Sequence, residues 1–162
     1  MNLSTKGRYA VMAMVDLARH ANGKPVALNE IAQRQEISLS YLEQLFARLR
    51  RGGLVVSARG PGGGYRLARG ADETRISDIM IAVDEPLKAT RCELGSPKGC
   101  TGQQGRCITH DLWEELGRQI YIFLSSVTLA DVVNKRVLGM SRAMDQAAPT
   151  QAPTQPQQDA AE

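Results

Sequence analysis

The sequence is poor in aromatic residues and contains no long apolar run. Phe, Trp and Tyr make up 4% of its 162 residues, while hydrophobic residues reach 43%. That is enough for one compact domain, or for a small domain with an appendage. No stretch approaches the ~18 consecutive apolar residues that cross a membrane. Asp16 and Arg19 interrupt the apolar residues near the N-terminus, and no cleavage site follows them. We therefore expect no secretion signal and no membrane partner, and we predict a cytoplasmic protein.

Cysteine and histidine are scarce, and they are concentrated in one segment. Residues 92–110 hold all three cysteines and one of the two histidines. Between Cys92 and Cys107 there are four glycines, one proline and a single aliphatic residue, Leu94. Such a segment cannot bury enough apolar surface to order itself, so something else must hold it. Because we expect reduced thiols, this segment is a candidate for metal binding or redox chemistry.

The ligand spacing excludes the common cysteine motifs. Seven residues separate Cys92 from Cys100, six separate Cys100 from Cys107, and two separate Cys107 from His110. Zinc fingers and ribbons use two tight ligand pairs, and bacterial ferredoxins use a compact run, so neither pattern fits. Three thiolates with one imidazole suit either zinc or a [2Fe–2S] cluster. Three idle thiols are the alternative, although clustered exposed cysteines are reactive.

A recognisable catalytic constellation is also missing. His110 and Asp111 form the only acid–base pair in view, and neither a nucleophile nor a second carboxylate constellation accompanies them. Catalysis by such a pair needs these further groups within reach. We therefore expect that the protein is not an enzyme.

Positive charge is concentrated in the N-terminal half. Residues 1–75 contain 12 Lys and Arg against six Asp and Glu, a net charge of +6, whereas residues 76–162 contain eight against 11, a net charge of −3. A basic half suits a polyanionic partner. Charge alone fits an ordinary solvated surface about as well, so the predicted elements must decide between the two.

Helical periodicity predicts a helix-turn-helix in this basic half. Apolar residues recur at helical spacing over residues 5–22, 28–35 and 39–51, and a three-residue turn joins the last two helices. Ser38 is the expected N-cap of the third helix, because Ile37 before it and Leu42 after it form a hydrophobic staple. The turn contains no glycine, so we expect Glu36 to adopt a strained backbone angle.

A glycine-rich hairpin follows the third helix. Residues 54–58 and 65–68 are short strand signals on either side of Arg-Gly-Pro-Gly-Gly-Gly at residues 59–64. This order predicts the wing of a winged helix. A phosphate-binding nucleotide loop would need a Gly-Lys-Ser/Thr ending and a following helix, and the sequence offers neither.

These elements predict a reader of double-stranded DNA, since a helix-turn-helix places the first turns of its second helix in the major groove. Gln44 can pair with adenine, and Glu43 can accept from a cytosine amino group. A carboxylate facing phosphates lowers affinity, so Glu43 indicates discrimination between sites. Arg59 suits a narrow minor groove. The expected DNA contacts are Lys6, Arg8 and Tyr9 from the first helix, Ser38, Ser40, Tyr41, Glu43, Gln44 and Arg48 from the third, and Arg59, Gly60 and Pro61 from the wing.

Two more helices flank the cysteine segment. Residues 76–84 predict a short helix capped by Ser77 or Thr74, and Thr109 is the expected cap of a long helix that ends near Ser126. The long helix is apolar on more than one face, which predicts contact with a second chain. Its main stripe is Leu112, Leu116, Ile120, Phe123 and Val127.

Four specific stretches lie in the first 85 residues. They are Met-Asn-Leu-Ser-Thr-Lys-Gly-Arg-Tyr-Ala at 1–10, Ile-Ser-Leu-Ser-Tyr-Leu-Glu-Gln-Leu-Phe at 37–46, Arg-Gly-Pro-Gly-Gly-Gly-Tyr at 59–65 and Ala-Val-Asp-Glu at 82–85. Together they resemble the bacterial iron–sulfur cluster regulators, which belong to a family of dimeric winged-helix repressors. The resemblance covers about residues 1–138.

This resemblance implies a [2Fe–2S] cluster, one per subunit, ligated by Cys92, Cys100, Cys107 and His110. It also implies a homodimer built by the long helix, binding to a palindromic operator, and repression of cluster-assembly genes when cluster is plentiful. Cluster donor proteins are further candidate partners. The cysteines stand further apart here than in the family pattern. Two alternatives stay open: a nitric-oxide or redox sensor of this fold with a different cluster, and a zinc-stabilised DNA-binding protein.

The expected fold class is mainly α with a small β wing, a winged helix-turn-helix domain followed by a long dimerisation helix. Residues 1–84 form the DNA-binding domain and 85–108 the cluster-binding loop. Residues 109–138 supply the dimerisation helix and a last short helix. Residues 139–162 are the expected disordered tail, since from residue 146 on no aliphatic residue is larger than alanine.

Overall fold

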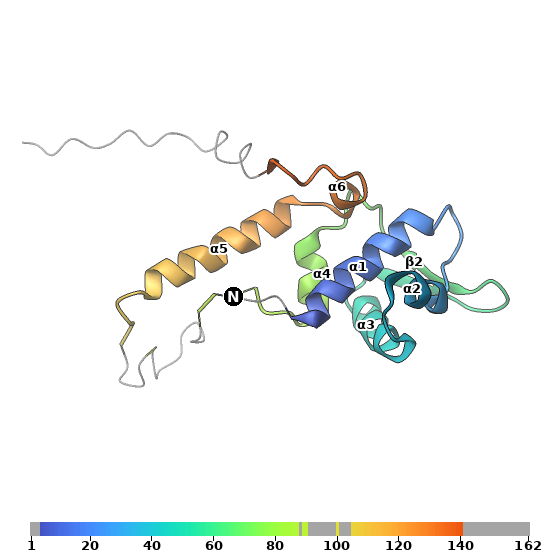
Figure 1. Cartoon of the computed structure of the whole chain (residues 1–162), viewed down its shortest axis with the longest axis horizontal. Helices are drawn as coiled ribbons and strands as arrows, with labels where there is room; N and C mark the ends of the chain where they lie inside the picture. Colours follow the sequence, from blue (N-terminus) through green and yellow to red (C-terminus); the bar gives the residue numbers. More distant parts are fainter. Residues whose placement is uncertain (1–3, 88, 91–99, 101–104, 141–162) are drawn as a thin grey trace, which may run out of the picture.

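The computed structural model describes residues 4–87, 89, 90, 100 and 105–140, and these are mainly α-helical with a two-stranded antiparallel sheet (Figure 1). The predicted fold class is confirmed, and the first three helices lie within two residues of their predicted bounds. The predicted ligand Cys92 and the tail from residue 141 lie outside the described residues. In chain order the elements are α1 (Thr5–His20), α2 (Leu28–Gln35), α3 (Leu39–Arg51), β1 (Val55–Ala58), β2 (Gly64–Leu67), α4 (Ile76–Ala82), α5 (His110–Ser126) and α6 (Leu129–Val133).

The hydrophobic core lies between α1, α2, α3, α4 and α6. α3 turns its apolar face inward, as its periodicity predicts, and Phe46 at the centre of that face is fully buried. Each side chain of this size contributes about 1.5–3 kcal/mol when it is removed from water. The largest fully buried side chains are Phe46, Met14, Leu17, Ile31, Leu42, Leu45, Leu49, Leu54, Ile79, Leu129, Val55 and Val83.

The turn between α2 and α3 has the strained angle that the sequence predicts. Glu36 has a φ of 55° and a ψ of 40°, in the left-handed region, where it ends α2. Ile37 and Leu42 are both buried on the core side, consistent with the predicted staple. Ser38 stands at the N-cap position of α3, but its side chain makes no capping hydrogen bond. The predicted N-cap position is therefore confirmed, and the Ile37–Leu42 staple rather than a bond from the Ser38 hydroxyl accompanies this helix start.

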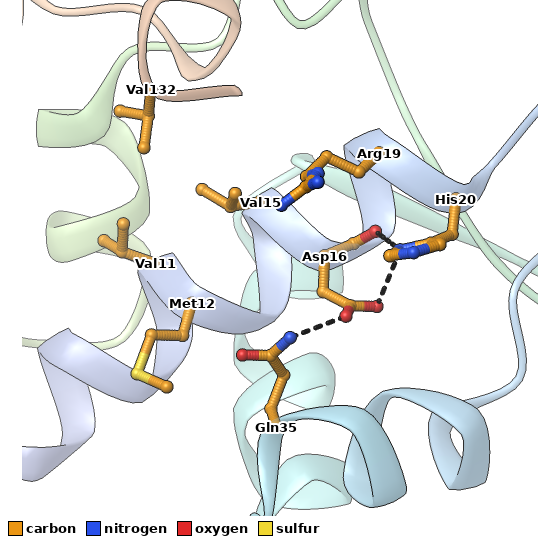
Figure 2. A pocket seen from close by; sticks show the side chains of 8 residues that line it. All are labelled: Val11, Met12, Val15, Asp16, Arg19, His20, Gln35 and Val132. Atoms are coloured by element: carbon orange, nitrogen blue, oxygen red, sulfur yellow. Dashed lines mark hydrogen bonds and ion pairs between the residues drawn. The ribbon is translucent and has the colours of Figure 1, made fainter. Parts of the chain in front are cut away.

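A buried carboxylate joins α1 to α2. The side chain of Asp16 is fully buried, and it accepts hydrogen bonds from Arg34 Nη2 at 2.7 Å and from Gln35 Nε2 at 2.7 Å. Figure 2 shows Gln35 and His20 converging on Asp16 beside a surface cavity of about 240 Å³. Burial raises the pKa of Asp16, but the hydrogen bonds from Arg34 and Gln35 outweigh it, so the pKa lies below its usual value. Asp16, which interrupts the apolar residues of α1, therefore holds α2 of the helix-turn-helix against α1.

The wing is anchored at its base. β1 and β2 pair antiparallel, with Val55 opposite Leu67 and Ala58 opposite Gly64. Val26, in the connection between α1 and α2, exchanges two backbone hydrogen bonds with Tyr65, at 2.9 and 2.8 Å. A Cβ at Gly64 would overlap the carbonyl group of Val26, so this close approach requires glycine.

The start of α4 differs from its prediction. The N-cap of α4 is Arg75, so the predicted caps Ser77 and Thr74 are both wrong. Ser77 lies inside the helix, and the Thr74 hydroxyl donates to the Gly70 carbonyl at 2.9 Å. The backbone here pairs with the segment between α5 and α6: Ile76 N–H donates to Val127 O at 3.0 Å, and Leu129 N–H donates to Thr74 O at 2.8 Å. This pairing ties the C-terminal end of α5 to the winged helix.

From that tie, α5 runs away from the body of the protein (Figure 1). Val127 at its C-terminal end is buried, whereas Leu112 near its start is 61% exposed. Trp113, Leu116 and Tyr121 are also exposed. Thr109 is the N-cap, as predicted, but its hydroxyl accepts from Trp113 Nε1 at 3.2 Å and makes no capping hydrogen bond to the backbone. Among the described residues, no helix is long and apolar enough to cross a membrane.

Candidate metal centre and nucleic-acid interface

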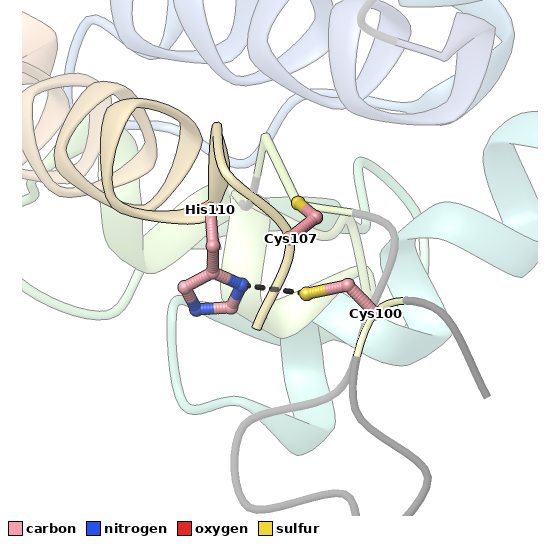
Figure 3. A group of neighbouring side chains, drawn as sticks. All are labelled: Cys100, Cys107 and His110. Atoms are coloured by element: carbon pink, nitrogen blue, oxygen red, sulfur yellow. Dashed lines mark hydrogen bonds between the residues drawn. The ribbon is translucent and has the colours of Figure 1, made fainter. Parts of the chain in front are cut away.

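Three of the four predicted ligands fall within the described residues, and the fold brings those three together (Figure 3). The Sγ atoms of Cys100 and Cys107 and the ring nitrogen of His110 all lie within 4.8 Å of one another. Cys100 Sγ is 2.8 Å from His110 Nδ1. All three side chains are partly buried. The predicted grouping is therefore present for Cys100, Cys107 and His110.

Local backbone contacts hold these ligands in place. Cys100 N–H donates to Gly105 O at 3.0 Å, and His110 N–H donates to Cys107 O at 3.0 Å. The second hydrogen bond closes a tight turn, which places Cys107 next to His110, the first residue of α5. His110 therefore stands on a rigid helix, whereas the two thiols come from the irregular segment before it.

The donor set fits a metal or an iron–sulfur cluster. Two thiols and an imidazole are the ligands that zinc and iron–sulfur clusters prefer. The far ring nitrogen, His110 Nε2, lies 3.4 Å from a carboxylate oxygen of Glu114, one helical turn along α5. Such a carboxylate fixes the ring orientation and tautomer of a metal-binding histidine. Glu114 was not predicted from the sequence, although residues four apart on a helix lie on the same face and Glu114 is four residues from His110.

A second group, His110, Asp111 and Glu114, also has its ligand atoms close together. Arg106 lies against both carboxylates, at 3.2 Å from Asp111 and 3.6 Å from Glu114. A guanidinium in this position already neutralises the acidic charge that a hard cation would need. The thiol side of His110 is therefore the better metal site.

The predicted DNA contacts of α3 and the wing lie on the surface. Ser38, Ser40, Glu43 and Gln44 are exposed on the first turns of α3. Tyr41 is partly buried, and its ring meets the edge of Tyr9 from α1 at a centroid distance of 6.1 Å. Arg8, Arg59, Gly60 and Pro61 are exposed as well.

Two of the predicted DNA contacts, Lys6 and Arg48, bind the same residue, Asp84, in this structure. Lys6 Nζ donates to the backbone carbonyl of Asp84 at 2.7 Å. Arg48 of α3 forms an ion pair with the Asp84 carboxylate. A phosphate contact at either side chain would therefore replace an existing contact of the protein.

The next residue, Glu85, caps α1 from the far end of the domain. α1 has no acidic residue in its first turn, and its N-cap Ser4 makes no local capping bond. Glu85 is 6% exposed, and its carboxylate accepts from the Ser4 N–H at 2.8 Å and from the Ser4 hydroxyl. A Cβ at Gly7 would lie 2.9 Å from Glu85 Cγ, so glycine leaves the room for this carboxylate. Burial alone would raise the pKa of Glu85. The hydrogen bonds from Ser4 and the positive charge of Lys6 outweigh burial, so the pKa lies below its usual value.

We expect Glu85→Gln to reduce the free energy of unfolding by about 1–2 kcal/mol at pH 7, because it removes a charged helix cap. The pKa of Glu85 is lowered in the folded protein, so its stabilisation is present above the ordinary value of 4.5 and is lost as pH falls below it. Urea unfolding of both proteins at pH 7 and pH 4 measures this difference. Ser4→Ala, which keeps the backbone N–H, should lose less stability and keep the pH dependence. An equal difference at both pH values would contradict this role of Glu85.

Comparison with known proteins agrees with this description. The sequence profile of the Rrf2 family, described as an iron-dependent transcriptional regulator, matches residues 3–135. A regulator from Serratia proteamaculans, named HTH-type transcriptional regulator IscR, is 53% identical over 136 residues, which are 84% of this chain and 81% of that protein.

Solved structures show the same fold. The structure of IscR from T. potens has a TM-score of 0.67 and 38% identity, with 84% of this chain and 88% of that chain covered. The structure of CymR from B. subtilis, titled as the global cysteine regulator, has a TM-score of 0.69 and 32% identity, with 83% and 98% covered. The chain therefore belongs to the Rrf2 family, and it is a DNA-binding transcriptional regulator rather than an enzyme.

Proposed function

We propose that this regulator senses iron–sulfur cluster status through a bound [2Fe–2S] cluster and controls, mainly by repression, the genes of cluster assembly. The observation that carries the proposal is the gathering of Cys100, Cys107 and His110 at the start of α5. Cys92 would be the fourth ligand. The relatives named IscR support the same reading.

Within this proposal, the ligand residues have distinct tasks. The thiolates would contribute most of the affinity for the cluster. With one cluster per subunit, oxidants and the availability of iron would change how much of the protein carries a cluster. His110 presents Nδ1 toward the thiols, and Glu114 orients the ring from the other side. Because an imidazole is the most exchangeable of the four ligands, His110 is the expected labile position.

The nucleic-acid side of the proposal rests on α3 and the wing. The exposed residues Ser40, Glu43 and Gln44 would enter the major groove, and Arg59 would reach the adjacent minor groove. Arg8, exposed near the start of α1, would contact a phosphate.

The same proposal makes α5 the dimer helix. Leu112, Trp113, Leu116 and Tyr121 leave a large apolar surface on a helix that extends from the body, and such surfaces mark protein contacts. Two-fold symmetry would then match a palindromic operator. The units would be residues 1–84 for DNA binding, 85–108 for the cluster, 109–138 for dimerisation and 139–162 as a tail. We also propose that the protein is cytoplasmic and that cluster donor proteins are among its partners.

Anaerobic purification followed by visible absorption and by iron, sulfide and zinc analysis tests the cofactor. We expect about two iron and two sulfide per chain, with thiolate-to-iron absorption bands. One zinc and no iron would replace the proposal with a zinc-stabilised DNA-binding protein. About four iron and four sulfide would favour a nitric-oxide or redox sensor instead. Ultracentrifugation of the same sample should give a dimer.

The DNA proposal predicts different behaviour for Arg59 and Arg8. Arg59→Ala should weaken operator binding by about 1–3 kcal/mol and relax its sequence preference. Arg8→Ala should weaken binding to all sequences alike and reduce the salt slope by about one. Titrations of operator and scrambled duplexes at several salt concentrations measure both effects. If the two variants behave identically on both duplexes, the division between groove and phosphate contacts is wrong.

A further inference from the structure

The C-terminal end of α4 meets both helices that would face DNA. Asp84 and Glu85, here called the Asp84–Glu85 junction, follow Val83, the C-cap of α4. Glu85 is buried against the N-terminal turn of α1 through Ser4. Asp84 is exposed, has a φ of 54°, and binds Arg48 of α3 through its carboxylate and Lys6 of α1 through its carbonyl oxygen.

A DNA phosphate and the Asp84 carboxylate would be alternative partners for Arg48. Both are oxyanions that a guanidinium binds through the same N–H groups. The Arg48–Asp84 pair is largely solvated, with side chains 38% and 75% exposed. Pairs of this kind are weak, so a phosphate can displace Asp84, although the exchange lowers the net gain. Neutralising Asp84 should then favour DNA on any sequence, because a phosphate carries no base identity.

The junction also lies at the entrance to the cysteine segment. Six residues separate Glu85 from Cys92, so the junction lies close along the chain to the first of the predicted ligands. The buried Glu85 carboxylate is fixed by its hydrogen bonds to Ser4, whereas the Asp84 carboxylate pairs with Arg48 on the surface. The contact to Arg48 is therefore the part of the junction that responds most easily to strain from the cysteine segment.

We propose that Asp84 competes with DNA phosphate for Arg48, and that the Asp84–Glu85 junction passes the state of the cysteine segment to α3 through this competition. The second half rests on the proposed cluster-sensing function. The first half concerns Arg48, Asp84 and DNA alone.

Asp84→Asn tests the competition. Asparagine tolerates the same left-handed backbone, so the variant removes the charge with little change of conformation. We expect about two- to fivefold tighter binding to any duplex and a steeper salt dependence. Asp78→Asn is the matched control, because Asp78 on α4 is also an aspartate that pairs with an arginine, Arg69, at 2.8 Å. The Asp78→Asn variant should show a smaller gain in DNA affinity than Asp84→Asn.

A double-mutant cycle separates a specific effect from one of net charge. In an Arg48→Ala background, Asp84→Asn should give no gain beyond that of Asp78→Asn. A full gain in that background, or equal gains from the two Asn variants, would overturn the competition. Thermal melts confirm that each variant is folded before its DNA titration.

The transmission is tested by comparing cluster-loaded and cluster-free protein. We expect the ratio of their operator affinities to shrink toward one in Asp84→Asn but not in Asp78→Asn. An unchanged ratio in Asp84→Asn would overturn the transmission. If the wild-type protein binds no cluster, the proposed function fails, while the cycle with Arg48 still decides the competition.

Discussion

Replacing Cys107 by alanine is expected to abolish cluster binding and, with it, any DNA binding that depends on the cluster. Cys107 is partly buried, and its Sγ belongs to the group with Cys100 and His110. Without Cys107, at most three of the four predicted ligands would remain to hold the proposed cluster. Loss of visible absorption and of iron from the anaerobically purified variant measures the effect.

Asp111→Asn is the matched control for this variant. Asp111 is adjacent to His110 and belongs to the alternative group of ligands, but it carries no thiol. Iron content should stay at the wild-type level in this variant. Retained iron in Cys107→Ala together with lost iron in Asp111→Asn would move the metal to the acidic side of His110.

A second large effect is expected at the centre of the core. Phe46→Ala should lower the free energy of unfolding by about 3–5 kcal/mol, because it removes a fully buried ring and leaves a cavity. The ring also meets the edge of Tyr65 on β2 at a centroid distance of 4.9 Å, which couples α3 to the wing. For a domain with a total stability of about 5–15 kcal/mol, this is a large share.

Urea unfolding at fixed protein concentration measures this loss, since the proposed dimer would make stability depend on protein concentration. Phe46→Leu keeps most of the volume and should cost less than about 1.5 kcal/mol. If alanine and leucine behave alike, the cavity is not the cause. A loss below 1 kcal/mol for alanine would mean that the core does not depend on this ring.

The sequence predicted well those features that depend on nearby residues. Periodicity placed α1, α2 and α3, and the turn without glycine predicted a strained backbone angle at Glu36, which has a φ of 55°. The glycine-rich stretch predicted the wing. The gathering of Cys100, Cys107 and His110 followed from their short separation and from a helix that starts at His110.

Features that depend on distant residues were missed. Glu85 caps α1 from 81 positions away, and no local pattern announces that contact. Asp16 read as an interruption of an apolar run, because its partner Arg34 lies on another helix. Local propensity identifies candidate caps, and tertiary contacts decide which of them form.

The anchoring of the wing sets a rule for the spacing of base pairs in any site that this protein recognises. Tyr65 is hydrogen-bonded to Val26, just before α2, and packs on Phe46 of α3, so the base of the hairpin moves as one body with the recognition helix. At the tip, Gly60 and Gly62 have φ values of 94° and 72°, in the region that glycine adopts without strain. If α3 and the tip contact DNA as proposed, half-sites could still differ in base composition. The number of base pairs between the major-groove contact and the minor-groove contact should be constant across all of them.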